Sequence, residues 1–174
     1  MSRVTLRYLT EEDEEEFYRA FQEDWKGWEF VFYWDTLGER NYKKWISLLP
    51  GFPEGKNLPE GHVKSSFLLA FNEEGKLVGR TSIRHELNDH LLKYGGNIGY
   101  GVCPSFRRQG YATEILKETL IHMRRELPSL EKGLVTCDDK NIGSIRTIEK
   151  NNGVLKDKIK QESGIITRRY WIEL

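Results

Sequence analysis

The stretch 98–116 constrains this chain most, because it reads as a β-strand, a basic turn and a helix in immediate succession. A short run of β-type residues ends at Pro104, and the turn 107–110 leads into an amphipathic pattern. A helix that begins directly after a strand presents unbonded backbone N–H groups at its N-terminus, where the helix dipole favours negative charge. With Arg107 and Arg108 beside those groups, the junction predicts a site for a phosphorylated ligand.

Composition limits the partners that we expect. The 174 residues include 27 lysines and arginines and 27 aspartates and glutamates, so the net charge is zero and no nucleic-acid partner is expected. Cys103 and Cys137 lie far apart without a His/Cys cluster, which predicts reduced thiols and no metal site. No apolar run reaches the roughly 18 residues of a membrane span, and the first residues do not read as a signal peptide. We therefore expect one soluble, cytoplasmic domain over residues 1–174.

Hydrophobic periodicity predicts strands and helices in a mixed order along the chain. The expected strands are 3–9, 67–71, 77–84, 97–102, 134–137, 154–161 and 165–173. A capping box at Thr10 and Asp13 predicts the start of a first helix, and further helices are expected over 37–49, 109–126 and 141–150. Residues 50–61, rich in proline and glycine, predict an irregular loop. The order is therefore β-α-α-β-β-β-α-β-α-β-β.

The basic turn also matches a family motif: Arg or Gln, two residues, Gly, one residue, then Gly or Ala. Arg107, Gly110 and Ala112 fit this pattern, and a strand ending at Val102 precedes it at the family's spacing. The run Asn-Ile-Gly-Ser at 141–144 repeats a second family feature at the start of the following helix. With the order of elements, these features resemble the GNAT superfamily of acyl-CoA-dependent N-acyltransferases over nearly the whole chain. The resemblance implies an α/β (α+β) fold, a single domain whose mixed, mostly antiparallel sheet is flanked by helices.

The resemblance also implies acetyl-CoA as the acyl donor. Backbone N–H groups at 107–113 would hold its pyrophosphate, and Gly110 would let the phosphates approach closely. The strand ending at Val102 would splay from strand 134–137, so that the pantetheine arm enters the gap and an N–H near Val102 polarises the thioester. Asn141 would bond that arm. The implied cofactor-binding residues are Tyr100, Val102, Arg107, Arg108, Gln109, Gly110, Tyr111, Ala112, Thr113, Asn141 and Ser144.

The catalytic residues follow less directly, because the chain departs from the family pattern. Many relatives place a tyrosine, as general acid, seven residues after the asparagine of the second feature, where this chain has Ile148. Ser144 is the candidate acid, and direct expulsion of the weakly basic thiolate is the alternative. His85 and Glu86, just beyond an expected strand, are the candidate bases, with a water chain as the alternative. A solvated polar turn explains the same two residues.

The segment after the first expected helix lies where this family builds one wall of the acceptor site. Six of its ten residues from 25 to 34 are aromatic. We expect core packing to account for most of them and one or two to line a substrate pocket. The aromatic residues are Trp25, Trp28, Phe30, Phe32, Tyr33 and Trp34.

Together these features predict an N-acetyltransferase that moves an acetyl group from acetyl-CoA to a primary amine by direct attack in a ternary complex. A non-catalytic acyl-CoA-binding sensor on the same fold is the alternative, because the family's tyrosine is missing. A nucleotide-phosphate enzyme is disfavoured, since neither Gly-x-Lys-Ser/Thr nor Gly-x-Gly-x-x-Gly occurs at the turn. The acceptor is a small-molecule or peptide amine, and a monomer or homodimer is expected, with no membrane contact and no metal.

Overall fold

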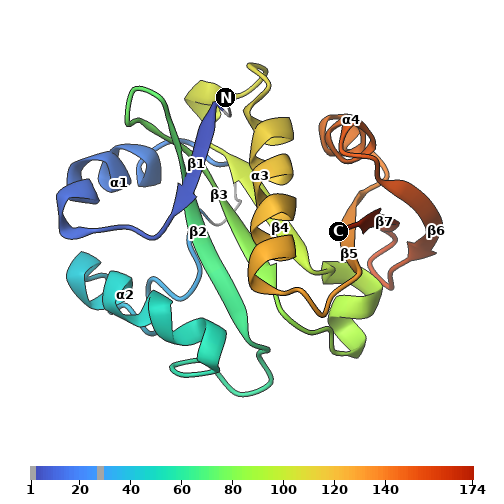
Figure 1. The fold of residues 1–174 in the computed structure, drawn as a ribbon, viewed down its shortest axis with the longest axis horizontal. Helices are drawn as coiled ribbons and strands as arrows, with labels where there is room; N and C mark the ends of the chain where they lie inside the picture. The colour runs from blue at the N-terminus through green and yellow to red at the C-terminus, as the bar shows by residue number, and fades with distance from the viewer. Residues whose placement is uncertain (1–2, 27–29) are drawn as a thin grey trace.

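The computed structural model describes residues 3–26 and 30–174, and their strands form one seven-stranded sheet (Figure 1). The strand order is β1-β2-β3-β4-β5-β7-β6, and every neighbouring pair is antiparallel except β4 with β5. This is the mixed, mostly antiparallel sheet that the sequence predicts. The strands are β1 (Val4–Arg7), β2 (Ser65–Asn72), β3 (Leu77–Arg84), β4 (Ile98–Val102), β5 (Lys132–Asp138), β6 (Val154–Lys160) and β7 (Ile166–Glu173).

Helices cover both faces of the sheet, with α1 and α2 on one side and α3 on the other (Figure 1). The alternation of side chains along β2 explains this division. Phe67, Leu69 and Phe71 pack with α1 and α2, whereas Leu68 and Ala70 pack with residues of α3. The helices are α1 (Glu14–Phe21), α2 (Tyr42–Leu48), α3 (Tyr111–Glu126) and α4 (Ile142–Lys150).

The predicted order of elements is confirmed, but several boundaries differ. The helix expected over 37–49 is confined to α2, because Glu39 and Arg40 have positive φ angles of 50° and 55°, which an α-helix does not allow. The expected loop 50–61 begins with a 3₁₀ helix, Leu49–Glu54, and a π-helix at Leu91–Gly95 precedes β4. The capping box of Thr10 and Asp13 is confirmed, at the start of a 3₁₀ turn that leads into α1.

Aromatic rings fill the core between the sheet and the first two helices. Phe17 of α1 is fully buried at its centre. Its ring centroid lies within 6.0 Å of six others. Such offset and edge-to-face contacts add to the burial of apolar area, so this half of the core is held mainly by ring packing. The six partners of Phe17 are Tyr18, Phe21, Phe30, Trp34, Tyr42 and Trp45.

Candidate active site

Strands β4 and β5 are joined at one end only. Their register contains a single pair, Ile98 with Val135. Buried Asn97 closes this end: its N–H donates to the Leu134 carbonyl over 2.7 Å, and its side-chain oxygen accepts from the Leu134 N–H over 2.9 Å. Past this point the strands separate, as the family resemblance implies.

The backbone of β4 turns hydrogen-bonding groups toward this gap. The Cys103 N–H donates to Val78 of β3 over 2.9 Å. Because N–H groups alternate between the two sides of a strand, those of Tyr100 and Val102 point away from β3 and toward the β5 side. The sheet therefore holds backbone donors where the family resemblance implies the thioester.

The turn after β4 opens α3 with further backbone donors. Gly110 is the N-cap residue with φ 89°, and Arg108 has φ 61°. Among the hydrogen bonds within the described residues, none is donated by the backbone N–H groups of 108–112. A Cβ built on Gly110 would have one neighbour within 4 Å, the Arg3 Nη1 atom at 3.7 Å, so the position is open to an approaching group. This arrangement fits a phosphate ligand at the N-terminus of a 16-residue helix.

Three arginines stand around this turn. Arg107 Nε donates to the Val102 carbonyl over 3.4 Å, and Arg108 occupies the turn itself. Arg3, from before β1, donates to the Gln109 carbonyl over 3.3 Å, and its guanidinium lies 5.0 Å from the centre of the Tyr111 ring. The sequence singled out the first two arginines. Arg3 lies 106 positions from Gln109, so no local pattern connects it with the turn.

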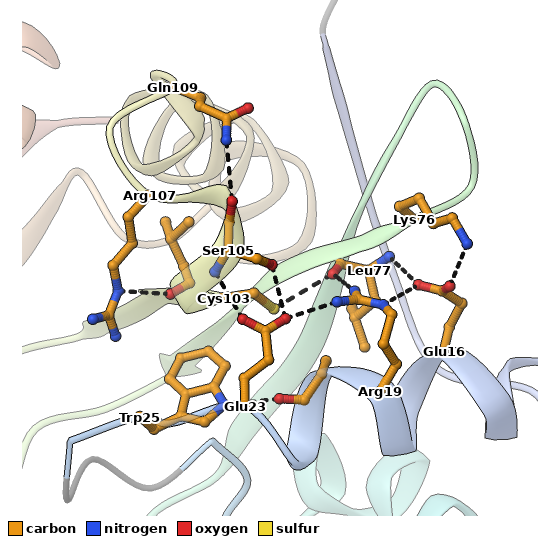
Figure 2. A network of polar contacts seen from close by, with 12 residues as sticks. Glu16, Arg19, Glu23, Trp25, Lys76, Leu77, Cys103, Ser105, Arg107 and Gln109 are labelled. Atoms are coloured by element: carbon orange, nitrogen blue, oxygen red, sulfur yellow. Dashed lines mark hydrogen bonds and ion pairs between the residues drawn. The ribbon is translucent and has the colours of Figure 1, made fainter.

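A polar network ties the same turn to the end of α1 (Figure 2). The Glu23 carboxylate accepts from the Ser105 N–H over 2.7 Å, from the Ser105 hydroxyl over 2.9 Å and from Arg19 over 2.7 Å. Arg19 also donates to the Leu77 carbonyl over 2.6 Å. Cys103 donates to that carbonyl as well, over 3.4 Å, and burial raises the pKa of its thiol to about 12. Cys103 is therefore an inert structural thiol.

The start of α4 brings three predicted residues together. The Asn141 side-chain oxygen caps the helix by accepting from the Ser144 N–H over 3.0 Å. The Ser144 hydroxyl oxygen lies 2.8 Å from the Tyr100 hydroxyl, which reaches it from β4. Burial raises the pKa of Tyr100 to about 12, so this phenol stays protonated at neutral pH. Ile148, at the position where many relatives have a tyrosine, is fully buried. The tyrosine that contacts this helix end is Tyr100, which comes from the sheet.

The opposite face of the sheet contains a hollow of about 930 Å³. Five of the six aromatic residues singled out in the sequence line it, and Trp28 lies outside the described residues. More rings line the hollow than the one or two expected, because rings that pack into the core on one side face the hollow on the other. The five are Trp25, Phe30, Phe32, Tyr33 and Trp34.

Two glycines of β4 bring the hollow close to the gap. A Cβ built on Gly101 would lie 3.5 Å from the Trp25 ring, and one built on Gly99 would lie 3.2 Å from the Arg84 Nη1 atom. Trp25 and Arg84 both line the hollow. Tyr100, between the glycines, faces α4 on the other side. Only the thickness of a strand backbone therefore separates the two regions.

The candidate bases lie away from the hollow. His85 Nε2 lies 2.9 Å from the Ser66 hydroxyl, and burial, with the nearby His122, holds the pKa of His85 below its usual 6.5. Ser82 and Arg84 line the hollow, and the next residue points to the opposite face of the sheet. Glu86 is exposed and is not among the lining residues. The assignment of either residue as base stays a prediction that the geometry does not favour.

The titratable residues that line the hollow, besides Arg84 and Tyr33, are Glu23, Asp35, His62 and His90.

The sequence gives no signal for His62 and His90. His62 lies just after the proline-rich loop and is hydrogen-bonded through Nδ1 to the Tyr33 hydroxyl, while His90 packs edge-on against Tyr94. His62 reaches the hollow from an irregular segment, and His90 reaches it from the helical turn that leads into the π-helix. Within residues 3–26 and 30–174, no group of three or more His, Cys, Asp or Glu side chains is arranged to hold a metal ion. In the same residues no helix is long and apolar enough to cross a membrane.

Three solved structures with the same fold are distant from this chain in sequence. The ribosomal L7/L12 alpha-N-protein acetyltransferase RimL in complex with coenzyme A aligns with a TM-score of 0.69 and 17% identity, covering 100% of this chain and 96% of that one. A chimera of the spermidine N-acetyltransferase SpeG from Vibrio cholerae and hSSAT gives 0.64 and 14%, with 99% and 95% covered. The microcin C7 self-immunity acetyltransferase MccE, in complex with acetyl-CoA and AMP, gives 0.66 and 18%, with 100% and 94% covered.

The family comparison is more specific. No curated protein matches the sequence. The model of the acetyltransferase (GNAT) domain matches residues 3–154, which include β4, the basic turn and the Asn141 cap. The match and the geometry agree: this chain belongs to the GNAT acetyltransferases.

Proposed function

We propose that this protein transfers an acetyl group from acetyl-CoA to a primary amine by direct attack in a ternary complex, without a covalent enzyme intermediate. The observation that carries the proposal is the construction of β4. Its unpaired edge continues into the N–H-rich turn, and its glycine face borders the hollow. One strand thus joins a site suited to the donor with a space suited to an acceptor.

On the donor side, backbone N–H groups of residues 108–112 bind the pyrophosphate, and Arg107 and Arg108 add positive charge. Gly110 admits the phosphates, since among the described residues beyond its chain neighbours only the Arg3 side chain lies within 4 Å of its missing Cβ. The oxygen of Asn141 is engaged as a helix cap, so its amide nitrogen is the group that we assign to the pantetheine arm. Two structural neighbours, RimL and MccE, were solved in complex with coenzyme A and acetyl-CoA, respectively.

At the reacting carbon, the Val102 N–H donates to the carbonyl oxygen of the thioester, where negative charge develops during attack. The amine arrives from the hollow in its neutral form, and the proton that it loses after forming the new C–N bond passes to water. The Ser144 hydroxyl donates to the leaving sulfur and accepts from Tyr100, at 2.8 Å. Tyr100 replaces the tyrosine that many relatives carry at the Ile148 position. Because the pKa of Tyr100 is about 12, it acts as a hydrogen-bond donor that stabilises the thiolate.

The acceptor that we propose is a small-molecule or peptide amine. The structural neighbours include an acetyltransferase for a ribosomal protein and one for spermidine, which are acceptors of these two kinds, and the fold alone does not choose between them. We place the protein in the cytoplasm as a monomer or homodimer, in keeping with its two free cysteines.

Thiol release tests the proposal. Purified protein is mixed with acetyl-CoA and single amines: amino acids, short peptides, polyamines and aminoglycosides. We expect at least one amine to release free coenzyme A thiol together with an equal amount of acetylated amine, measured by mass spectrometry. Reactions without an amine measure background hydrolysis. Tight binding of acetyl-CoA with no thiol release from any amine would instead support the acyl-CoA sensor.

A further inference from the structure

The hollow carries a positive charge that no carboxylate in the described part of the chain neutralises. Arg84 lines it, and its two terminal nitrogens lie 3.2 and 3.6 Å from a Cβ built on Gly99, so the guanidinium rests on β4. The ion pairs of the described residues do not include Arg84. Its hydrogen bond to the Gly95 carbonyl is long, at 3.4 Å. A guanidinium stays charged under such conditions and has more donors than this one acceptor uses.

The other charged groups of the hollow do not offset Arg84. Glu23 is held by Ser105 and Arg19, and Asp35 is paired with Arg40 at the exposed rim. The inner end of the hollow therefore favours a negatively charged group.

We infer that the acceptor is a small amine that also carries an oxyanion, a carboxylate or a phosphate, which Arg84 binds. The inference rests on the proposed function and names its acceptor class. Both oxyanions accept two parallel hydrogen bonds from a guanidinium. Gly99 and Val102 are three residues apart, roughly 10 Å along an extended strand, so a metabolite-sized molecule reaches from Arg84 to the open end of the gap. A polyamine meets repulsion at Arg84.

Matched pairs of acceptors test the inference on the unaltered protein. Serine is compared with serinamide, and phosphoethanolamine with ethanolamine, with spermidine as a cationic amine. We expect kcat/KM for one anionic member to exceed that of its neutral partner by roughly 10- to 100-fold, with the difference mainly in KM. A difference within the serine pair identifies a carboxylate as the group that Arg84 binds, and a difference within the phosphoethanolamine pair identifies a phosphate. Equal or better use of the neutral members, or of spermidine, would overturn the inference.

Substitution of Arg84 tests its role separately. Arg84→Gln should raise KM for the anionic acceptor roughly 10- to 100-fold, with kcat and the affinity for acetyl-CoA nearly unchanged, and Arg84→Lys should restore part of the loss. Arg125→Gln, at the exposed end of α3, is the matched control. Unchanged acetyl-CoA affinity shows that the variants are folded. An unchanged KM in Arg84→Gln would remove Arg84 from acceptor binding.

Calorimetry separates this inference from the proposed function. Coenzyme A without an acetyl group serves as an unreactive donor, and the two anionic amines are titrated into its complex with the protein. Binding that Arg84→Gln weakens supports the inference even when no thiol is released, in which case the proposed function alone fails. Thiol release from amines in general, without any dependence on Arg84 or on the oxyanion, supports the function and overturns the inference.

Discussion

The donor turn (residues 103–113), which follows the end of β4, and the hollow, which borders the glycine face of that strand, differ in construction. The donor turn is one continuous segment that offers backbone N–H groups, whereas the hollow collects side chains from segments between Phe21 and Leu91. A site made of backbone depends on the few residues that set its conformation, such as Gly110. A site made of side chains depends on every lining residue. Substitutions should therefore affect the donor turn at few positions but severely, and the hollow at many positions.

The largest effect is expected from Gly110→Glu. The carboxylate adds negative charge and bulk where the phosphates bind, so the affinity for acetyl-CoA should fall more than about 100-fold by calorimetry. Gly164→Glu is the control, because Gly164 has φ 85° and no atom of residues 3–26 or 30–174 outside its chain neighbours lies within 4 Å of its missing Cβ. Both variants take a similar backbone strain of roughly 1 kcal/mol. Equal acetyl-CoA affinity in the two would show that the turn does not bind the donor.

The next effect concerns the leaving thiolate. Tyr100→Phe removes the hydroxyl that contacts Ser144, so kcat should fall roughly 100-fold while acetyl-CoA affinity changes little. Ser144→Ala should give a similar loss, and the double variant little more, because the two hydroxyls act as one unit. Tyr18→Phe, on α1, is the control. If both single variants kept the kcat of the parent, the thiolate would leave without this assistance.

A smaller effect is expected where the two regions meet. Glu23→Gln keeps the size of the side chain but loses its ion pair with Arg19 and weakens its hold on Ser105. The free energy of unfolding should fall by about 1–2 kcal/mol in urea, and acetyl-CoA should bind a few-fold more weakly. Glu126→Gln breaks an exposed pair with Arg125 and should change stability by less than about 0.5 kcal/mol. Loss of stability without weaker acetyl-CoA binding would show that the network holds only the fold.

The smallest effect is a pH dependence of stability. Burial holds the pKa values of His85 and His122 below the usual 6.5, so the unfolded chain takes up more protons than the folded one. Their contribution is present above pH 6.5 and is lost as pH falls through the folded pKa values. Replacing both by Gln should flatten the decrease in Tm below pH 6.5, a change of roughly 1–3 °C. Loss of thiol release in a folded His85→Gln variant would instead support its assignment as base.

The comparison also explains how much of the molecule could be predicted from the sequence. The order of strands and helices follows from periodicity, and the donor turn follows from residues 107–112, since contiguous residues that share one task leave a local pattern. The contact between Tyr100 and Ser144 joins positions 44 apart, and Arg3 reaches a turn over a hundred positions away. Contacts between residues so far apart depend on how the whole chain folds, so no local sequence pattern predicts them.

The expectation for His85 shows the physical limit most clearly. The end of a strand can place a base in the acceptor site, but adjacent side chains on a strand point to opposite faces of the sheet. Arg84 faces the hollow and His85 faces Ser66. Only the register of β3 against β2 and β4 determines which of the two residues points to which face of the sheet. Five rings of the aromatic segment line the hollow, and how many of them face it depends on turns that carry no periodic signal.

The two glycines of β4, Gly99 and Gly101, are positions where we expect a substitution to change acceptor selectivity without altering the donor turn. A methyl group at position 101 would meet Trp25 at an ordinary contact distance of 3.5 Å, whereas one at position 99 would press on Ser82 at 3.0 Å and on Arg84 at 3.2 Å. Gly99→Ala thus shifts the guanidinium with the smallest possible addition to the chain. We therefore expect position 99 to tune acceptor selectivity, and a laboratory selection for new acceptors can begin there.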